Sequence, residues 1–555
     1  MEFTENLGLK KPGQDDFYDV DDFNYNAEIL DKEVSGHAGT DIYSESGVHG
    51  IRYFDEQLEV RDKDGEWIAI EAGSSGLAPG DCTDISVKAG NGKLTIFWSD
   101  PEDITADQVV CRWAGTKLVQ KAGSYPKNPK DGTVLVNNQT RDAYKDNGFV
   151  VTGLQNNTTY YFTLFPYSDK NAVNISSANR MTGTPQPYRK MTVKIDLNNS
   201  NPATCCTYAD DAVDMAAGSA DWDTFFGHYP CLFKNGAEVG KLDPNDFTKF
   251  SDGSDADITS GDAGDVMIAF PRRGLTINTV DDIVTVSMTD DPDNDDFKYY
   301  AHSRGEVKKD KFYFGAYKGY LNGIKLRSVT GNTPRYGATI GKFREYAQAN
   351  GSGYDISGFY QITYLQAMYL LKYKNLDSQS MIGRGMTGRV SNFPFASGGT
   401  EAYGMDCELI KQTNPTYMTD GEHHVKLFGI EDFWGNIYEF VDGVYCNGSY
   451  NILAATDNFD DYGSGYTTIG QVATDAISGY MSKIQGTSEL GFIPKQCNGS
   501  ETTYFCDMAS LNKSCNAAFG DYWGSNYTIT GAFHLRFHLD ASHSNSYVGA
   551  RLMYL

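Results

Sequence analysis

The chain closes on the stretch FGDYWGSNYTITGAFHLRFHLDASHSNSYVGARLMYL, which occupies residues 519–555. Within it, apolar and polar residues alternate from Ala532 to Asp540. A period of two over this length predicts a strand with one buried and one solvated face. Residues 548–555 predict a final core strand. We expect the buried side of this region to consist of Phe533, Leu535, Phe537, Leu539, Val548 and Leu552.

The solvated face of the predicted strand is unusual. Histidine, arginine and aspartate stand where exposed strands favour Thr, Lys and Glu, and aromatic and small polar residues flank them. Adaptable binding surfaces combine rigid aromatic anchors with small hydrogen-bonding groups. A plain antiparallel strand with a polar outer face would give the same pattern, because exposed aromatic residues are common. The binding interpretation predicts an outward surface made of Asp521, Tyr522, Trp523, Ser525, Asn526, Tyr527, His534, Arg536, His538, Asp540, His543, Asn545 and Tyr547.

Length and composition indicate a folded, acidic, multidomain protein. The chain has 555 residues, enough for three or four domains, and its hydrophobic content of 40% can supply real cores. The formal net charge is −26. Nucleic acids and anionic membrane surfaces both attract basic patches, so the charge argues against either as a partner. The composition fits a soluble particle or surface protein.

The sequence carries no export or membrane signal that we recognise. No apolar run approaches the roughly 20 residues that a transmembrane helix needs, and the N-terminal MEFTENLGLKKPGQDD lacks the apolar core of a signal peptide. We therefore expect folding in a cytoplasm and no membrane insertion. The ten cysteines are scattered and have no CxxC spacing, which predicts free, buried thiols and neither a zinc site nor a disulfide framework.

Residues 1–75 predict an N-terminal attachment and oligomerisation region. An acidic arm extends to about residue 45, and short strands are expected at residues 51–54, 57–61 and 67–70. Such an arm needs a partner to order it, and three short strands are marginal alone. We therefore expect this region to work in an oligomer.

Residues 76–185 follow a Gly/Ser/Pro linker and predict a β-sandwich. Alternating strands are expected at residues 94–98 and 109–113. In the later segment VVTGLQNNTTYYFTLFPY, Leu154 and Tyr160 stand as in a tyrosine corner. The region resembles the fibronectin type III, immunoglobulin-like sandwich. Domains of this kind are mostly spacers, so no site is expected here.

Residues 186–555 predict an α+β domain with insertions. A strand is expected at residues 190–195 and a helix around residues 210–217. The clearest helices are expected at residues 339–349 and 358–373, where apolar residues recur near helical spacing. Nothing catalytic falls on them, and they are interpreted as scaffold.

Two acidic clusters interrupt this region, at residues 252–257 and 290–296. Hard oxygen ligands of this kind suit calcium. Neither cluster has EF-hand spacing, with Gly at loop position six and Glu at position twelve. Solvated turns are the simpler interpretation.

One motif gives a family resemblance. Residues 428–443 read FGIEDFWGNIYEFVDG, in which Gly435-Asn436 predicts a tight turn and residues 437–441 a core strand. The WGNIYEF segment resembles the GN-aromatic-E-aromatic segment of the formylglycine-generating-enzyme-like branch of the C-type lectin fold. Combined with the closing GARLMYL, it resembles the variable proteins of diversity-generating retroelements. The whole chain is similar to phage tail-tip proteins, above all those of phages and prophages of Gram-positive gut bacteria.

The resemblance implies a function. A phage tail receptor-binding protein would recognise a host cell-surface receptor, glycan or protein, through a variable surface at about residues 506–555. The resemblance also implies a homotrimer, attachment to other tail proteins through the N-terminal arm, and location in the virion after synthesis in the bacterial cytoplasm. In that family, adenine-directed mutagenesis scatters Asn, Tyr, Ser, His, Asp and Thr over fixed surface positions. No catalytic residue, cofactor or metal is implied, and the chain is expected not to be an enzyme.

Two alternative classes stay open. Formylglycine-generating enzymes share the fold and use a pair of reactive cysteines near the C-terminus, but Cys506 and Cys515 do not stand in that family's active-site context. A glycan hydrolase needs two facing carboxylates, and no pattern identifies a pair. A bacterial surface adhesin would need an export signal and an anchor.

Histidine-based metal chemistry has weak support in the sequence. On a strand, His534 and His538 would stand roughly 13 Å apart, too far to share one zinc ion. His423 and His424 are adjacent in a predicted loop, which directs their side chains to opposite sides. Neither pair predicts a metal site.

Overall fold

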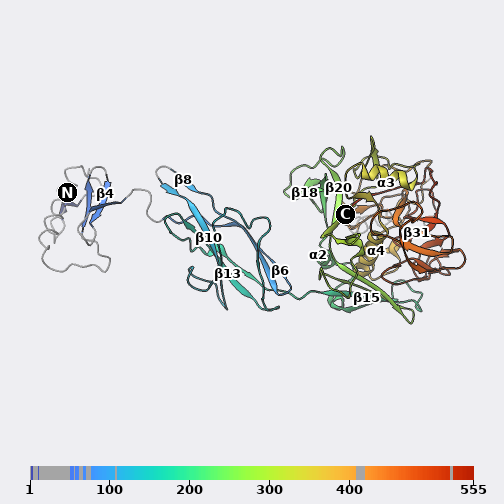
Figure 1. The fold of residues 1–555 in the computed structure, drawn as a ribbon, viewed down its shortest axis with the longest axis horizontal. Coiled ribbons are helices and arrows are strands. Elements are labelled where there is room, and N and C mark those ends of the chain that lie inside the picture. The colour runs from blue at the N-terminus through green and yellow to red at the C-terminus, as the bar shows by residue number, and fades with distance from the viewer. Residues whose placement is uncertain are drawn as a thin grey trace. The chain divides into compact units, whose positions relative to one another are not determined.

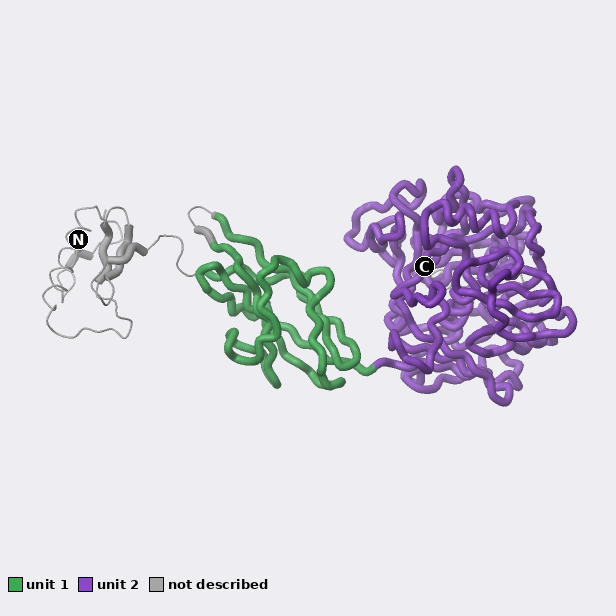
Figure 2. Tube along the Cα trace, in the orientation of Figure 1, with its two compact units in different colours: residues 1–187 green, residues 188–555 purple. Residues whose placement is uncertain are grey.

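The computed structural model divides the chain into two compact units, residues 1–187 and 188–555, which Figure 2 colours separately. Both are mainly β, and most of their strand pairs are antiparallel (Figure 1). Of residues 1–76 only the backbone of a few short strands is described. Beyond these, the described residues are 77–106, 109–389, 391–407, 419–525 and 529–555.

The first unit begins with short strands. β3 (Gly50–Phe54), β4 (Gln57–Arg61) and β5 (Trp67–Ile70) form an antiparallel meander, which confirms the three predicted strands. β1 (Glu2–Phe3) pairs with β2 (Lys10–Lys11). The rest of the predicted acidic arm lies outside the described residues.

Two antiparallel sheets follow in the first unit, and they share one core. Leu94 and Trp98 from one sheet and Phe162 and Leu164 from the other are fully buried in a single cluster, so the sheets pack face to face. The strand expected at residues 109–113 is interrupted, because β8 (Ile104–Ala106) pairs with β9 (Val109–Cys111) as a separate hairpin. The sheets are ordered β12 (Phe149–Val151), β7 (Lys93–Ser99), β6 (Thr83–Gly90) and β11 (Thr133–Asn138), β10 (Trp113–Lys121), β13 (Tyr160–Ser168), β14 (Arg180–Gly183).

Tyr160 fixes the turn that precedes its own strand. Its hydroxyl accepts a hydrogen bond from the Gln155 N–H at 2.8 Å. Leu154 packs half-buried against the same core. This bond ties the start of β13 to the loop that precedes it.

Three larger sheets make up most of the second unit. The four-stranded sheet is ordered β16 (Cys206–Asp210), β15 (Lys190–Asp196), β22 (Ile283–Thr289), β21 (Gly274–Val280). The seven-stranded sheet is ordered β19 (Asp246–Phe250), β18 (Ala237–Asp243), β17 (Tyr229–Lys234), β20 (Asp265–Pro271), β25 (Lys311–Gly315), β41 (Leu552–Tyr554), β28 (Tyr354–Ile356). The eight-stranded sheet is ordered β33 (Thr467–Gln471), β32 (Asn451–Ala454), β31 (Tyr438–Cys446), β38 (Cys515–Phe519), β39 (Leu535–Leu539), β37 (Met508–Leu511), β34 (Ile477–Tyr480), with β40 (Val548–Gly549) paired to β31.

The last residues join the two largest sheets. The closing strand expected at residues 548–555 is split, because β40 pairs with β31 whereas β41 lies between β25 and β28. The chain changes sheets at Ala550 and Arg551, which are both buried.

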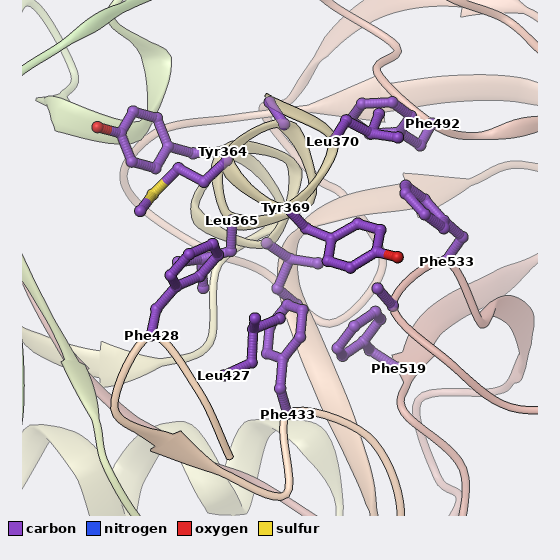
Figure 3. Close-up of a cluster of buried hydrophobic side chains, with 14 of the residues drawn as sticks. Tyr364, Leu365, Tyr369, Leu370, Leu427, Phe428, Phe433, Phe492, Phe519 and Phe533 are labelled. Carbon is purple, nitrogen blue, oxygen red and sulfur yellow. The ribbon is translucent and has the colours of Figure 1, made fainter. Parts of the chain in front are cut away.

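The helix α4 (Phe359–Tyr373) runs through the core of the second unit, and every one of its residues is buried. Figure 3 shows Tyr364, Leu365, Tyr369 and Leu370 directed from α4 into other large apolar side chains. A helix that is apolar on all sides is stable only where other elements cover all of it. The neighbours labelled in Figure 3 are Leu427, Phe428, Phe433, Phe492, Phe519 and Phe533.

Both long predicted helices are confirmed. α4 begins after Gly358, and α3 (Ile340–Gln348) begins after Thr339. The Thr339 hydroxyl accepts a hydrogen bond from the Lys342 N–H at 3.3 Å, which satisfies one of the free donors at the start of the helix.

The prediction of a helix around residues 210–217 is wrong. β16 extends to Asp210, only a 3-10 turn follows at Asp211–Asp214, and α2 (Asp221–Phe226) comes later. The helix forms there because Trp222 and Phe225 supply a buried face, whereas in the 3-10 turn only Ala212 is buried and Val213 is 61% exposed.

Arg551 is fully buried where the two sheets meet. Its Nε donates to Glu439 Oε1 at 2.8 Å, and its Nη1 donates to the Gly315 carbonyl at 3.0 Å. Its Nη2 donates to the carbonyls of Glu431 and Asp432, each at 2.9 Å. One side chain of the closing GARLMYL segment thereby binds the WGNIYEF strand, β25 and the turn after β30 (Ile430–Glu431).

Glu439 is the anionic partner of this arginine. It is 1% exposed, and it also binds Lys318 Nζ at 2.7 Å and the Ser357 hydroxyl at 3.0 Å. The two cations lower the pKa of Glu439 even though burial raises it. Removing one member of this buried ion pair would cost much stability, because the other member would be left as an unpaired buried charge.

We expect Arg551→Lys to destabilise the second unit by about 3–5 kcal/mol, because an ammonium cannot reach the four acceptors that the planar guanidinium binds. Urea unfolding followed by tryptophan fluorescence measures the loss. The exposed Lys495 gives a matched control, since Lys495→Arg should change the free energy of unfolding by less than about 0.5 kcal/mol. Equal midpoints for the two variants would contradict this account of the core.

Candidate functional site

The segment 506–555 supplies three neighbouring strands of the eight-stranded sheet. β38 and β39 pair antiparallel, and β39 pairs in parallel with β37. The strand expected at residues 532–540 is confirmed as β39, although it begins only at Leu535. The six residues expected in the core are all buried, at 2% exposure or less: Phe533, Leu535, Phe537, Leu539, Val548 and Leu552.

Three residues expected to face solvent are buried, so that prediction is wrong for them. Trp523 is 3% exposed and packs with Met386 and Ile437. Its Nε1–H donates to the Ser391 carbonyl at 3.0 Å. The cause is the segment between β38 and β39, which packs against neighbouring loops instead of standing in solvent.

Asp521 and His534 are the other two, and both are fully buried. Asp521 accepts hydrogen bonds from the hydroxyls of Ser525 at 2.5 Å and Thr530 at 2.6 Å. His534 places Nε2 3.8 Å from this carboxylate and Nδ1 2.9 Å from the Ile529 carbonyl oxygen. Because His534 precedes β39, the alternation of the strand does not extend to it. Burial lowers its pKa.

Three of the remaining side chains gather over Tyr438, which lies on β31, and a fourth, His543, packs beside one of them. The ring centroids of Tyr522, His538 and Tyr547 are 5.9, 5.4 and 6.4 Å from that of Tyr438. Tyr547 also lies 5.3 Å from Tyr522 and 5.8 Å from His543. All but Tyr438 are half-buried. Tyr522, His538, His543 and Tyr547 are called the aromatic cluster below.

Arg536 adds a fixed positive charge beside the aromatic cluster. Its Nη1 donates to the Tyr438 hydroxyl at 3.1 Å and its Nε to the Ser510 hydroxyl at 3.2 Å. Asn545 places its Nδ2 2.7 Å from Nε2 of His543. The guanidinium and the amide are therefore held in place before any ligand arrives.

The other predicted surface residues are further from the cluster or cannot be placed. Asp540 is exposed and accepts hydrogen bonds from the N–H and hydroxyl of Ser542, which makes it a turn cap. Ser525 is half-buried and bonded to Asp521. Asn526 and Tyr527 lie outside the described residues.

Three aromatic residues near the aromatic cluster were missed by sequence reasoning. Tyr336 and Phe395 pack against the same small core as Tyr522 and Tyr547. Phe393 is 53% exposed and stacks on Tyr336 with ring centroids 5.7 Å apart. They come from loops far from the C-terminus in sequence, and no local pattern marks them.

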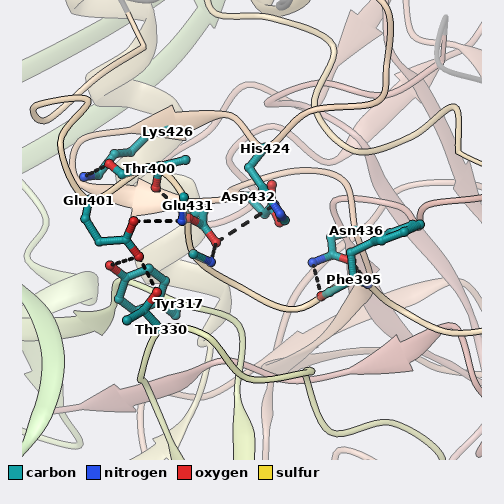
Figure 4. A network of polar contacts seen from close by, with 12 residues as sticks. Tyr317, Thr330, Phe395, Thr400, Glu401, His424, Lys426, Glu431, Asp432 and Asn436 are labelled. Atoms are coloured by element: carbon teal, nitrogen blue, oxygen red, sulfur yellow. Dashed lines mark hydrogen bonds and ion pairs between the residues drawn. The ribbon is translucent and has the colours of Figure 1, made fainter. Parts of the chain in front are cut away.

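Asn436 of the WGNIYEF motif holds one of these loops. Its Oδ1 accepts from the Phe395 N–H at 2.8 Å, and its Nδ2 donates to the Phe395 carbonyl at 3.0 Å (Figure 4). Its own carbonyl accepts from the Trp523 N–H at 3.1 Å. Gly435 has a φ of 89°, and a Cβ there would meet the Met386 backbone N at 2.9 Å. The tight turn predicted at these two residues is confirmed.

Two rings of the aromatic cluster have pKa values that are shifted away from neutrality, so both are uncharged at neutral pH. Burial, followed by the positive charge of Arg536, lowers the pKa of His538 to about 4. Burial also raises the pKa of the Tyr522 phenol. Rings of this kind bind ligands by stacking and through hydroxyl and imidazole hydrogen bonds.

The cysteines considered for oxidase chemistry are not activated. Burial raises the pKa of the Cys506 and Cys515 thiols, so both are in the weakly nucleophilic thiol form at neutral pH. All ten cysteines are free, as predicted, and all are buried except Cys497 and Cys515, which are half-buried.

The acidic cluster at residues 252–257 makes local turn contacts, whereas in the cluster at residues 290–296 Asp290 pairs with Arg189. Asp252 accepts hydrogen bonds from Ser254, and Asp257 accepts them from Thr259 and Ser260. These bonds lower the pKa of Asp257 to about 2. Contacts of this kind are what solvated turns make.

A third polar group was not recognised from the sequence. Among the described residues, His424, Glu431 and Asp432 form the one group whose ligand atoms could hold a metal ion, all within 4.8 Å of one another. Burial lowers the pKa of His424, but the two carboxylates outweigh it and raise that pKa to about 9. The sequence shows His423 and His424 as two adjacent histidines in a predicted loop. Their distance along the chain from Glu431 and Asp432 matches no known spacing of metal ligands.

Comparison with known protein families finds no match to this chain, and no curated protein matches it either. Throughout the described ranges, no helix has the length and apolar character needed to cross a membrane. The function must therefore be inferred from the chain's own residues.

We expect Trp523→Ala to destabilise the second unit by about 3–5 kcal/mol, because it empties a buried ring site and removes the bond to Ser391. The matched control is Tyr462→Ala, since Tyr462 is 65% exposed and its loss should cost less than about 0.5 kcal/mol. Thermal or urea unfolding measures both. If Trp523→Ala behaved like the control, Trp523 would belong to the solvated surface after all.

The low pKa of His538 predicts a loss of stability in acid. An unfolded histidine has a pKa near 6.5, so between about pH 6.5 and 4 the unfolded chain binds a proton that the folded chain does not. The stabilisation is complete above about pH 6.5 and is lost as the pH falls toward 4, by up to about 3 kcal/mol. In His538→Phe, the melting temperature should fall less than in the native chain between pH 7 and 4.5. An identical fall in both proteins would show that His538 titrates normally when folded.

Proposed function

We propose that this chain is a phage tail receptor-binding protein that recognises a host cell-surface ligand through the aromatic cluster of its C-terminal region. The observation that carries the proposal is the convergence of Tyr522, His538, His543 and Tyr547 on one face of the eight-stranded sheet, beside Arg536. Aromatic rings and arginine are the side chains that most often dominate binding energy at recognition surfaces.

The support for this surface is rigid, which favours binding over catalysis. Tyr438 lies under the cluster on a buried strand, and Arg536 is hydrogen-bonded to it. Preorganised side chains lose little entropy when a ligand binds. Cys506 and Cys515, which an oxidase of the resembled family would need, have raised pKa values. We therefore propose that the chain is not an enzyme.

We also propose that the second unit is a C-type lectin-like domain of the formylglycine-generating-enzyme type. The WGNIYEF and GARLMYL segments, which carry the resemblance, meet through the bonds between Glu439 and Arg551. Such a domain would be expected to pack these two segments together. The variable-protein interpretation follows from the same resemblance, with positions of the aromatic cluster as the variable ones.

The remaining regions have supporting roles in this proposal. The sandwich of the first unit is a fibronectin type III-like spacer, which the bond from the Gln155 N–H to the Tyr160 hydroxyl supports. The N-terminal region attaches the protein to other tail proteins. Trimeric display in the virion would raise the avidity of a face that binds weakly as a single copy.

Binding to bacterial cells tests the proposal. The purified chain is labelled and mixed with a panel of strains, and the double variant Tyr522→Ala/Tyr547→Ala is measured on every strain that binds. Removing two aromatic anchors should weaken binding at least about tenfold, because each is worth about 1–2 kcal/mol at a recognition surface.

The variant Tyr462→Ala serves as the control for a lost exposed tyrosine and should bind as the native chain does. Circular dichroism checks that the double variant is folded. Equal binding by a folded double variant would contradict the proposed site and would direct attention to the first unit or the acidic loops.

A further inference from the structure

A compact polar group lies beside the motif turn, away from the C-terminal segment in sequence. His424 precedes β29 (Lys426–Leu427), while Glu431 ends β30 and Asp432 follows it. Figure 4 shows the three side chains converging. His424 Nδ1 lies 2.7 Å from Asp432 Oδ2 and 3.9 Å from Glu431 Oε1.

One oxygen of this group has no partner. Asp432 is fully buried, and its Oδ1 accepts no hydrogen bond. A buried carboxylate oxygen without a donor is costly, and nearly all buried polar atoms in folded proteins are paired. An unsatisfied carboxylate oxygen beside a second carboxylate and an imidazole offers a cation a set of ligand atoms.

The positive side chains nearby are committed elsewhere. Lys426 donates its Nζ to the Thr400 carbonyl at 2.8 Å. Arg551 donates to the backbone carbonyls of Glu431 and Asp432, not to their carboxylates. Lys426 also stabilises Glu431 electrostatically, but among the described residues His424 is the one side chain that forms an ion pair with either carboxylate.

The surroundings hold the ligand atoms in position. Glu431 accepts the Gly398 N–H at 2.7 Å and the Thr400 hydroxyl at 2.5 Å. The two Arg551 bonds fix the backbone of both acidic residues. Supporting hydrogen bonds of this kind orient metal ligands in proteins.

We propose that His424, Glu431 and Asp432 bind a divalent transition-metal ion of the zinc or manganese class. When an ion binds, His424 releases its proton to solvent and offers a neutral imidazole nitrogen. One imidazole nitrogen and two carboxylate oxygens suit these ions, whereas calcium prefers oxygen ligands alone. The His424 side chain is 15% exposed, so an ion can enter from solvent. The site is independent of receptor recognition. It joins the loop of His424 to the turn that leads into the WGN motif.

Metal uptake by the full chain tests the site. The protein is stripped with EDTA, and Zn²⁺ or Mn²⁺ is titrated by calorimetry, with bound metal counted by elemental analysis after dialysis. The native chain should bind one ion that His424→Gln and Asp432→Asn do not bind. One bound ion at a hundredfold excess over its Kd should also raise the melting temperature, since it stabilises the folded state only.

The control variant is His543→Gln, which removes a histidine outside the proposed site and should leave the uptake unchanged. If Asp432→Asn does not fold, His424→Gln decides the matter, because that side chain stands at the rim. Uptake that survives in His424→Gln would overturn the proposal and would indicate adventitious binding, for example by free thiols. Uptake of Ca²⁺ with no uptake of Zn²⁺ or Mn²⁺ would overturn the assigned class, and no uptake of any ion would overturn the site.

Discussion

The buried guanidinium of Arg551 is the constraint on which the second unit depends. It binds the carboxylate of Glu439 and three backbone carbonyls, one from Gly315 and two from the adjacent Glu431 and Asp432. It thereby fixes the point at which the C-terminal chain passes from the eight-stranded sheet to the seven-stranded sheet. A charged group so deep in a core is tolerable only when every donor is satisfied. The closing residues are therefore part of the scaffold. The loop between β39 and β40 is held at one end by β39 and at the other by the closing residues.

This scaffold limits which C-terminal side chains can serve recognition. Trp523, Asp521 and His534 look like surface residues by type, yet they pack or bond inside the loop between β38 and β39. The residues that remain accessible are the aromatic cluster, Arg536 and their loop neighbours. Substitution at the half-buried positions removes only part of a packed side chain's contacts, whereas substitution at the three buried ones would disturb the loop itself. A variable surface could therefore change the aromatic cluster and Arg536 while Trp523, Asp521 and His534 stay the same.

Much of the fold follows from local sequence patterns. Apolar spacing located α3, α4, β15 and β39, since each presents a continuous buried stripe. The pattern failed where tertiary contacts decide: the helix at α2 depends on Trp222 and Phe225 meeting the core, and His534 is buried by a loop rather than by strand alternation. Only part of the candidate site could be predicted, for the same reason. Tyr522 and Tyr547 lie in the C-terminal segment whose pattern predicted a binding surface. Phe393 lies near them, and His424 lies near Glu431 and Asp432, only because of long-range packing.

The most direct test of the central claim is hydrogen exchange on the full chain, with and without a cell-envelope extract from a strain that the protein binds. If the aromatic cluster is the recognition face, added protection should appear in peptides covering residues 520–547 and the loop around residue 395. The first unit should exchange as before, because the residues that make up the proposed face all belong to the second unit. Protection confined to residues 77–187, with the C-terminal segment unchanged, would contradict the account.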